Sequence, residues 1–121
     1  MLQMHPRYGL WHAWRCALVL PTLCAQDARD LAAARPAATD LCLSCEDQPC
    51  LTACPVQAFS ATGYDVDSCA GFLHSADGAD CMQAGCQARR ACPVGVEYRY
   101  VPEHASFHMA AFAARRATRS T

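Results

Sequence analysis

The stretch CLSCEDQPCLTACP, residues 42–55, places four cysteines within thirteen positions and follows the last of them with a proline. Its spacing is Cys42-x2-Cys45-x4-Cys50-x3-Cys54-Pro55. Proteins use thiols at this density for three kinds of chemistry, which are disulfide cross-linking, zinc binding and iron–sulfur ligation. The rest of the chain has to decide among them.

A second block of four cysteines has a similar design. It reads Cys69-x11-Cys81-x4-Cys86-x5-Cys92-Pro93. Both blocks end in Ala-Cys-Pro-Val, as ACPVQAF at 53–59 and as ACPVGVEY at 91–98. The chain therefore contains an imperfect internal duplication, with four thiols in each half.

Iron–sulfur ligation accounts for this pattern best. A short loop with three close cysteines can wrap one face of a cubane cluster and point backbone N–H groups at its sulfides. In the bacterial two-cluster arrangement, the cysteine before proline ligates the other cluster and so ties the two halves together. Applied here, it predicts a first [4Fe-4S] cluster on Cys42, Cys45, Cys50 and Cys92. It predicts a second on Cys69, Cys81, Cys86 and Cys54.

Zinc is the main alternative. Structural zinc sites usually pair two short Cys-x2–4-Cys hooks. The chain offers one close match and two weaker ones: Cys42/Cys45, then Cys50/Cys54 and Cys81/Cys86. Zinc does not require the repeated Cys-Pro, so the pattern favours iron–sulfur over zinc, with disulfides third. Cys16 and Cys24 lie far from both blocks, and we expect them to be small buried hydrophobic residues rather than ligands.

The apolar segments predict a soluble, cytoplasmic protein. No apolar run approaches the eighteen or more residues of a membrane span. CALVLPTLCA (16–25) follows Arg15 and could pass for the apolar region of a secretory signal, but His12, Arg15 and Pro21 interrupt the apolar segment around it and no small-x-small cleavage site follows. In a reducing cytosol the ten cysteines would not form five disulfides.

Composition sets further limits. The hydrophobic fraction of 53% allows a packed core, but it includes ten cysteines and many alanines, so we expect a modest core supplemented by cross-links. The formal net charge is −1, and all the basic residues are arginine. No basic run is long enough to suggest a nucleic-acid groove, so nucleic acid is not an expected partner.

Three regions separate by composition, at 1–40, 41–100 and 101–121. In the first, GLWHAWRCALVLP (9–21) predicts a strand or buried segment, followed by a helix from Asp27 to Arg35 and a Pro/Ala linker. The last should be a helix that starts after Pro102, with Arg115 and Arg116 near its end. Its core-facing stripe should comprise Val101, Ala105, Met109 and Phe112. The fold class is α+β: a small, helix-rich, ferredoxin-like domain with an N-terminal strand segment, small antiparallel strands and a C-terminal helix.

Several other side chains could act near the clusters. Arg89 and Arg90 could raise the potential of the second cluster or dock an acidic partner, although plain solvated surface is the simpler interpretation. His104 and His108 lie one helical turn apart, but no third metal ligand accompanies them, which favours a surface or cluster-facing role. Five aromatic residues are expected to pack over the clusters: Tyr64, Tyr98, Tyr100, Phe59 and Phe72.

The cysteine segments resemble the dicluster ferredoxin-type domain of bacterial iron–sulfur proteins, and in particular that of epoxyqueuosine reductases. The resemblance covers about residues 41–95 and is carried by CLSCEDQPCLTACPVQAF, YDVDSC and GADCMQAGCQARRACPVG. This chain departs from the family pattern in the four residues between Cys45 and Cys50 and in the wider spacing of the second block. These departures leave the pairing of Cys69 and Cys81 open.

A weaker resemblance lies at the N-terminus. HPRYGLWHAWRCALVLP is similar to the HPxxGxWxAxR segment near the end of the cobalamin-processing domain of cobalamin C trafficking proteins. That similarity implies that residues 1–40 are a remnant of an upstream α/β domain. Simple packing beside the ferredoxin-type domain is the equally weighted alternative. The family's cobalamin-binding and catalytic residues have no counterpart in this chain.

The expected function is electron transfer through two [4Fe-4S] clusters, with a redox protein as partner. The first alternative is the C-terminal electron-relay module of a cobalamin- or flavin-dependent reductase that works with a separate catalytic subunit. The second is a zinc-stabilised interaction domain. The sequence shows no arrangement of serine, histidine and carboxylate and no phosphate loop, so independent catalysis is not expected.

Overall fold

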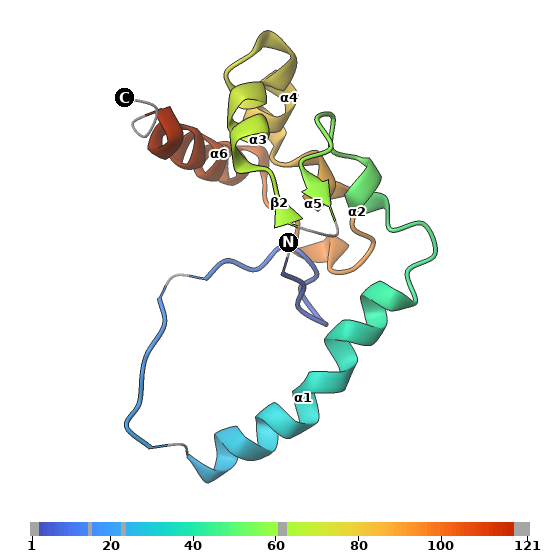
Figure 1. The fold of residues 1–121 in the computed structure, drawn as a ribbon, viewed down its shortest axis with the longest axis vertical. Helices are drawn as coiled ribbons and strands as arrows, with labels where there is room; N and C mark the ends of the chain where they lie inside the picture. The colour runs from blue at the N-terminus through green and yellow to red at the C-terminus, as the bar shows by residue number, and fades with distance from the viewer. Residues whose placement is uncertain (1–2, 15, 23, 61–62, 118–121) are drawn as a thin grey trace.

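The computed structural model describes residues 3–14, 16–22, 24–60 and 63–117, with the backbone alone at 31–32, 34–40 and 117. Its elements are, in chain order, α1 (Ala25–Leu43), α2 (Pro49–Thr52), β1 (Phe59–Ser60), β2 (Gly63–Tyr64), α3 (Val66–Leu73), η1 (Ala76–Gly78), α4 (Ala79–Ala84), α5 (Gln87–Ala91), η2 (Val96–Tyr98) and α6 (Pro102–Ala117). The result is a small, helix-rich α+β fold with one two-stranded antiparallel sheet (Figure 1).

The sheet confirms the prediction of small antiparallel strands, and it lies between the two cysteine blocks. Phe59 lies opposite Tyr64 and Ser60 opposite Gly63. The rings of Phe59 and Tyr64 are stacked with their centroids 4.8 Å apart, a cross-strand aromatic pair that stabilises so short a hairpin. Directly after β2, the side chain of Asp65 accepts a hydrogen bond from the backbone N–H of Ser68 and so caps α3.

The predicted N-terminal strand is wrong. Residues 11–14 and 16–20 have no regular secondary structure, and only a bridge between His5 and Gly9 closes a turn before them. Leu10 and Trp11 are buried, but Leu18 and Val19 are 84% and 95% exposed. A strand needs a neighbouring strand to pair its backbone groups, and the described sheet lies elsewhere in the chain.

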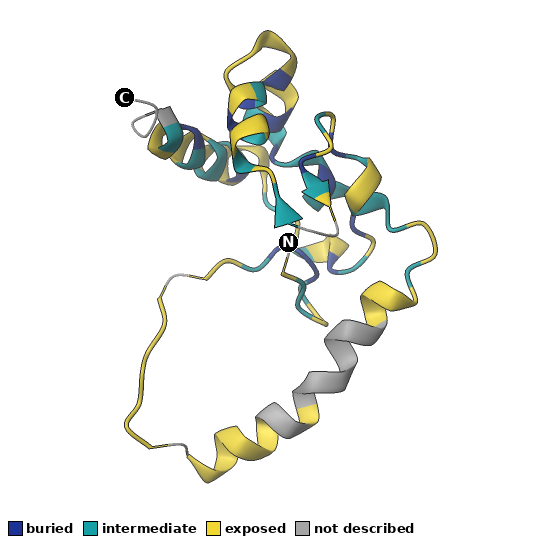
Figure 2. Ribbon diagram, in the orientation of Figure 1, coloured by how far each residue is buried: buried dark blue, intermediate teal, exposed yellow. Residues whose placement is uncertain are grey.

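Helix α1 is longer than the predicted helix. It continues past Pro36 to Leu43, so the segment interpreted as a linker is helical. Proline removes a single helical N–H, and the alanines on both sides of it have the highest helix propensity of all residues. Figure 1 shows α1 lying apart from the other helices, and the side chains described along it are exposed (Figure 2).

Helix α6 confirms the predicted C-terminal helix, with one change to its buried face. Ala105 is buried, and Met109 and Phe112 are half-buried, as expected. Val101 precedes the helix and is exposed, so its place in the predicted stripe is wrong. Ala113, one turn after Met109, is buried instead and packs against Leu73 and Cys81.

The core consists of two small clusters of mostly small side chains. One cluster gathers Cys54, Ala58 and Ala88, and the other gathers Leu73, Cys81 and Ala113. Alanine and cysteine bury little area each, which agrees with the modest core expected from the composition. In the part of the chain described, no helix combines the length and the apolar character needed to cross a membrane.

Candidate metal centre

Three closely spaced thiols and one from a distant part of the chain form a first group. Cys42 lies near the end of α1, Cys45 in the loop after it, Cys50 in α2 and Cys92 directly after α5. Burial raises the pKa of the Cys42 thiol, and the nearby thiols of Cys92 and Cys45 raise it further. Burial also raises the pKa of Cys50, and the other three thiols add to this effect. We call these four cysteines the first quartet.

The other four thiols form a second group. Cys69 lies in α3, Cys81 in α4 and Cys86 at the start of α5, while Cys54 follows α2. Burial raises the pKa of Cys69, and the thiols of the other three cysteines raise it as well. Burial also raises the pKa of Cys81, and so does the thiol of Cys86. We call these four the second quartet.

The two groups have the same members as the two predicted ligand sets, including the exchanged Cys-Pro residues, while metal binding by them stays a prediction. Cys92, from the second half of the sequence, lies with the thiols of the first half, and Cys54 lies with those of the second. The packing of α2 against α5 brings this exchange about, because Cys54 and Cys92 follow these two helices. The spacing alone left open whether Cys69 and Cys81 belong to the same group, and in the structure these two residues lie near each other.

Hydrogen-bond donors point at the sulfurs of the second quartet. The hydroxyl of Tyr64 donates to Cys69. Burial, and after it this bond, raises the pKa of the tyrosine, and the bond partly offsets the rise that burial causes in the pKa of the Cys69 thiol. The backbone N–H of Ala58 donates to Sγ of Cys54 at 3.3 Å, and that of Gln87 donates to Cys81. Donors of this kind stabilise the negatively charged thiolate, which is the form of cysteine that binds a metal.

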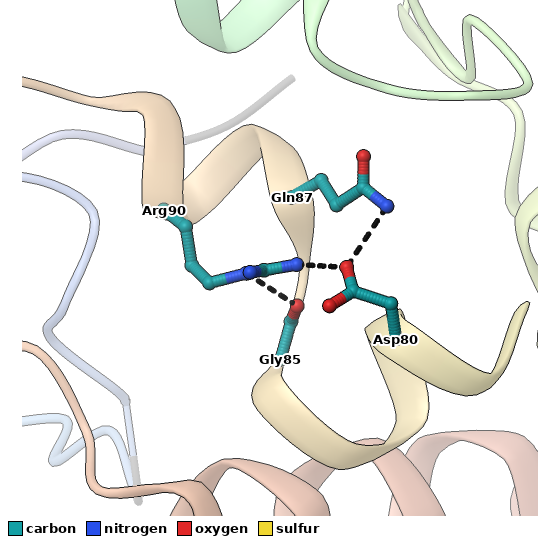
Figure 3. A network of polar contacts seen from close by, with 4 residues as sticks. All are labelled: Asp80, Gly85, Gln87 and Arg90. Atoms are coloured by element: carbon teal, nitrogen blue, oxygen red, sulfur yellow. Dashed lines mark hydrogen bonds and ion pairs between the residues drawn. The ribbon is translucent and has the colours of Figure 1, made fainter.

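A polar network fixes the loop that carries Cys86 (Figure 3). The guanidinium of Arg90 forms an ion pair with Asp80 and donates from Nε to the carbonyl oxygen of Gly85 at 3.1 Å. Gln87 donates to the same carboxylate at 2.9 Å. These contacts join α4 to α5 across the Gly85–Cys86 turn, so Arg90 serves as a structural clamp rather than as free positive charge.

The repeated Cys-Pro-Val motif is followed in both halves by a residue in the left-handed backbone conformation. Gln57 and Gly95, each three residues after the cysteine, both have positive φ angles, of 48° and 72°. This left-handed conformation is natural for glycine and uncommon for glutamine. The internal duplication seen in the sequence thus extends to the backbone conformation at this one position.

The N-terminal segment packs onto the second of these left-handed residues. A β-carbon on Gly95 would lie 2.5 Å from the carbonyl carbon of Tyr8, so the two backbones are in direct contact. The rings of Tyr8 and Tyr98 meet edge to face at 4.9 Å, and Arg7 donates to the Tyr98 hydroxyl at 2.9 Å. On the other side, Sγ of Cys42 lies 3.2 Å from the thioether sulfur of Met4. The segment therefore borders the first quartet.

The remaining predicted residues have mixed outcomes. Cys16 and Cys24 are exposed, so the prediction that they are buried is wrong. Phe59 and Tyr64 pack against the core cluster containing Cys54, and Phe72 packs against the one containing Cys81. The other two aromatic residues lie elsewhere, because Tyr98 contacts Tyr8 and Tyr100 contacts Trp11. The sequence around these five aromatic residues does not indicate which of the rings lies near which group of cysteines.

The histidine pair lies on the surface of α6. Nε2 of His104 and Nε2 of His108 are 2.9 Å apart, and the ring of Tyr100 stacks on His104 at 4.2 Å. The two imidazoles are therefore hydrogen-bonded to each other. Over all the described residues, no three His, Cys, Asp or Glu side chains are gathered tightly enough to hold a metal ion.

Sequence reasoning missed the N-terminal contact and the hydroxyl of Tyr64. The glycines of RYGLW and CPVGV were signals of close backbone approach, but nothing in the sequence paired them. Comparison with known proteins adds no guide, since no family model, curated protein or solved structure matches the chain.

Proposed function

We propose that this chain binds two [4Fe-4S] clusters, one on each quartet, and transfers electrons to or from a redox partner. The observation that carries the proposal is the division of the eight cysteines into two quartets that exchange their Cys-Pro members. Two-cluster ferredoxin-type domains use this exchange to place two cubanes side by side. The ferredoxin-like character of the fold belongs to the same proposal.

The residues present suit this cofactor. Each quartet offers four thiols, which is the ligand number of a cubane. The N–H and O–H groups that donate to Cys54, Cys69 and Cys81 would tune its potential. A cubane is also larger than a single ion, so its thiolates stand further apart than those of zinc, which lie within about 4 Å of one another.

The proposal is tested by metal analysis of the full chain after anaerobic purification and reconstitution. We expect about eight iron and eight sulfide per chain, with spin-coupled cubane signals in the EPR spectrum of the dithionite-reduced protein. A variant with Cys16→Ser and Cys24→Ser is the matched control and should keep the full iron content. Stoichiometric zinc without iron would overturn the proposal in favour of a zinc-stabilised interaction domain.

A second candidate is an electron-relay module that serves a cobalamin- or flavin-dependent reductase related to epoxyqueuosine reductase. The packing of Tyr8 and Gly9 against Val94 and Gly95 favours it, because the segment similar to a cobalamin-processing domain borders the first quartet. In this case a separate catalytic chain would co-purify, and corrin or flavin absorbance would accompany the iron. A chain that purifies alone, without such absorbance, and still exchanges electrons with a small ferredoxin partner would contradict this candidate.

A further inference from the structure

A cavity of about 490 Å³ opens beside the second quartet, and Cys69 and Cys86 form part of its lining. Cavities of this size are in the range that binds small molecules and cofactors. Cys54 and Cys81, the buried members of the quartet, do not line it. The cavity therefore lies on one side of the quartet, next to its two less buried thiols.

Aromatic rings dominate the lining. Six aromatic residues contribute to it: Trp11, Trp14, Phe59, Tyr64, Tyr100 and Phe112. Flat faces at this density suit a planar conjugated ligand, which gains contact area and stacking against them. Trp14 lines the cavity and is 77% exposed, so much of this residue is open to contact with a ligand even though its ring meets His12 and its Nε1 donates to Gln3.

The charges at the cavity favour a negative ligand. Arg89 lines it, and no hydrogen bond or ion pair of the Arg89 side chain is found within the described residues, whereas the neighbouring Arg90 is paired with Asp80. His12 and His108 also contribute to the lining, and none of the described lining residues is a carboxylate. An anionic substituent would therefore meet the guanidinium of Arg89 and no carboxylate, while the net negative charge of a thiolate-bound cluster would lie on the side of the cavity formed by Cys69 and Cys86.

We propose that this cavity binds a planar, conjugated two-electron acceptor with an anionic substituent, stacked on Trp14, paired with Arg89 and reduced from the second quartet. The inference rests on the proposed function, because the electrons come from the two clusters. Each reduced cluster is oxidised by one electron, and the pair of electrons with two protons from water converts a quinone to its hydroquinone. A low-potential one-electron donor protein then reduces the clusters again.

The test uses 1,4-naphthoquinone-2-sulfonate as probe and 1,4-naphthoquinone as the comparison without the anion. Both tryptophans of the chain line the cavity, so quenching of their fluorescence reports binding in the cluster-free chain. Equilibrium dialysis measures binding to the cluster-loaded chain. We expect the loaded chain to bind the sulfonate more tightly than the parent quinone. When it is reduced with dithionite, desalted and mixed with the probe, it should form one hydroquinone per chain.

Two variants and a control make the test specific. Trp14→Ala should weaken binding at least about fivefold, the lower end of the cost of losing an aromatic stack. Arg89→Gln should weaken binding of the sulfonate and leave that of the parent quinone unchanged. Arg29→Gln, on the exposed face of α1, is the matched control and should bind like the wild type. Neither Trp14 nor Arg89 belongs to a quartet, so all three variants should retain full iron content.

Each remaining outcome overturns the inference in a recognisable way. Iron-loaded chain that does not bind the probe, or binds it equally well without Trp14 and Arg89, overturns the cavity assignment and leaves the proposed function standing. If the probe binds the cluster-free chain but not the cluster-loaded chain, the cavity is the space that the cluster itself occupies. Absence of iron overturns the proposed function, and with it the electron transfer, even where the probe binds.

Discussion

The hydroxyl of Tyr64 donates a hydrogen bond to the sulfur of Cys69, and the two residues are joined through a short turn and the first turn of α3. Tyr64 ends β2, and its ring stacks on Phe59 across the hairpin, so the strand pair holds the hydroxyl in place. The segment YDVDSC, residues 64–69, thus supplies a predicted ligand, the hydrogen-bond donor to that ligand and the Asp65 cap of the ligand's helix.

Replacing Tyr64 by phenylalanine should lower the reduction potential of the cluster proposed on the second quartet. The donated hydrogen bond favours the state with more negative charge on sulfur, which is the reduced cluster. A difference of about 1 kcal/mol between the two redox states corresponds to about 40 mV for one electron. EPR-monitored redox titration measures both clusters in the same sample. Only the signal of the second cluster should move.

Tyr98→Phe is the matched control for this change. The Tyr98 hydroxyl accepts a hydrogen bond from Arg7 and contacts no cysteine that the structure describes. Its removal should leave both potentials unchanged. Equal shifts in the two variants, or a shift of the first cluster in Tyr64→Phe, would show that the hydroxyl of Tyr64 does not act through Cys69.

The exchange of Cys-Pro residues between the halves can be tested by counting iron in double variants. Cys54→Ala should remove the second cluster and leave about four iron per chain. Adding Cys69→Ala should cost nothing more, because both residues belong to the same quartet. Adding Cys45→Ala instead should remove the remaining iron. The reverse result, with about four iron kept in the Cys54/Cys45 pair, would assign each Cys-Pro cysteine to its own half of the sequence.

The sequence predicted which cysteines lie near one another more closely than it predicted the fold, and the reason is physical. Cysteine spacing and the repeated Cys-Pro are local features, and the two groups of thiols have the members that the spacing predicts, while metal binding by these groups stays a prediction. The N-terminal strand failed because strand formation depends on a distant partner. The predicted helix ends at Arg35 because proline is interpreted as a helix breaker from its own chemistry alone. In the structure the alanines around Pro36 allow α1 to continue. Packing of Tyr8 against Gly95 involves residues too far apart in sequence for any pattern to join them.

Protonation of Asp65 should weaken α3. The hydrogen bonds from the hydroxyl and backbone N–H of Ser68 hold the pKa of the Asp65 carboxyl below its ordinary value. A carboxyl with a lowered folded-state pKa stabilises the fold above the ordinary value of about 4, and this contribution disappears as the pH falls through the folded-state pKa. Asp65→Asn keeps a cap without the charge, so its urea midpoint should fall less between pH 7 and pH 3 than that of the wild type. Parallel losses in the two proteins would contradict the assignment.

The contact between Gly95 and Tyr8 predicts that Gly95→Ala destabilises the chain by more than about 1 kcal/mol in urea unfolding. Alanine at this position has an unfavourable positive φ, and its β-carbon would lie 2.5 Å from the Tyr8 carbonyl carbon. Gln57→Ala is the matched control, because Gln57 has the same left-handed conformation after the other copy of the motif but is exposed. Its change should stay within about 0.5 kcal/mol because glutamine already carries the cost of the positive φ, so the excess in Gly95→Ala measures the positive φ of alanine together with the clash. Limited proteolysis between residues 12 and 24 should also release the N-terminal segment from Gly95→Ala sooner than from the control. Equal stability and equal proteolysis of the two variants would mean that the N-terminal segment does not pack on the turn that follows Cys92.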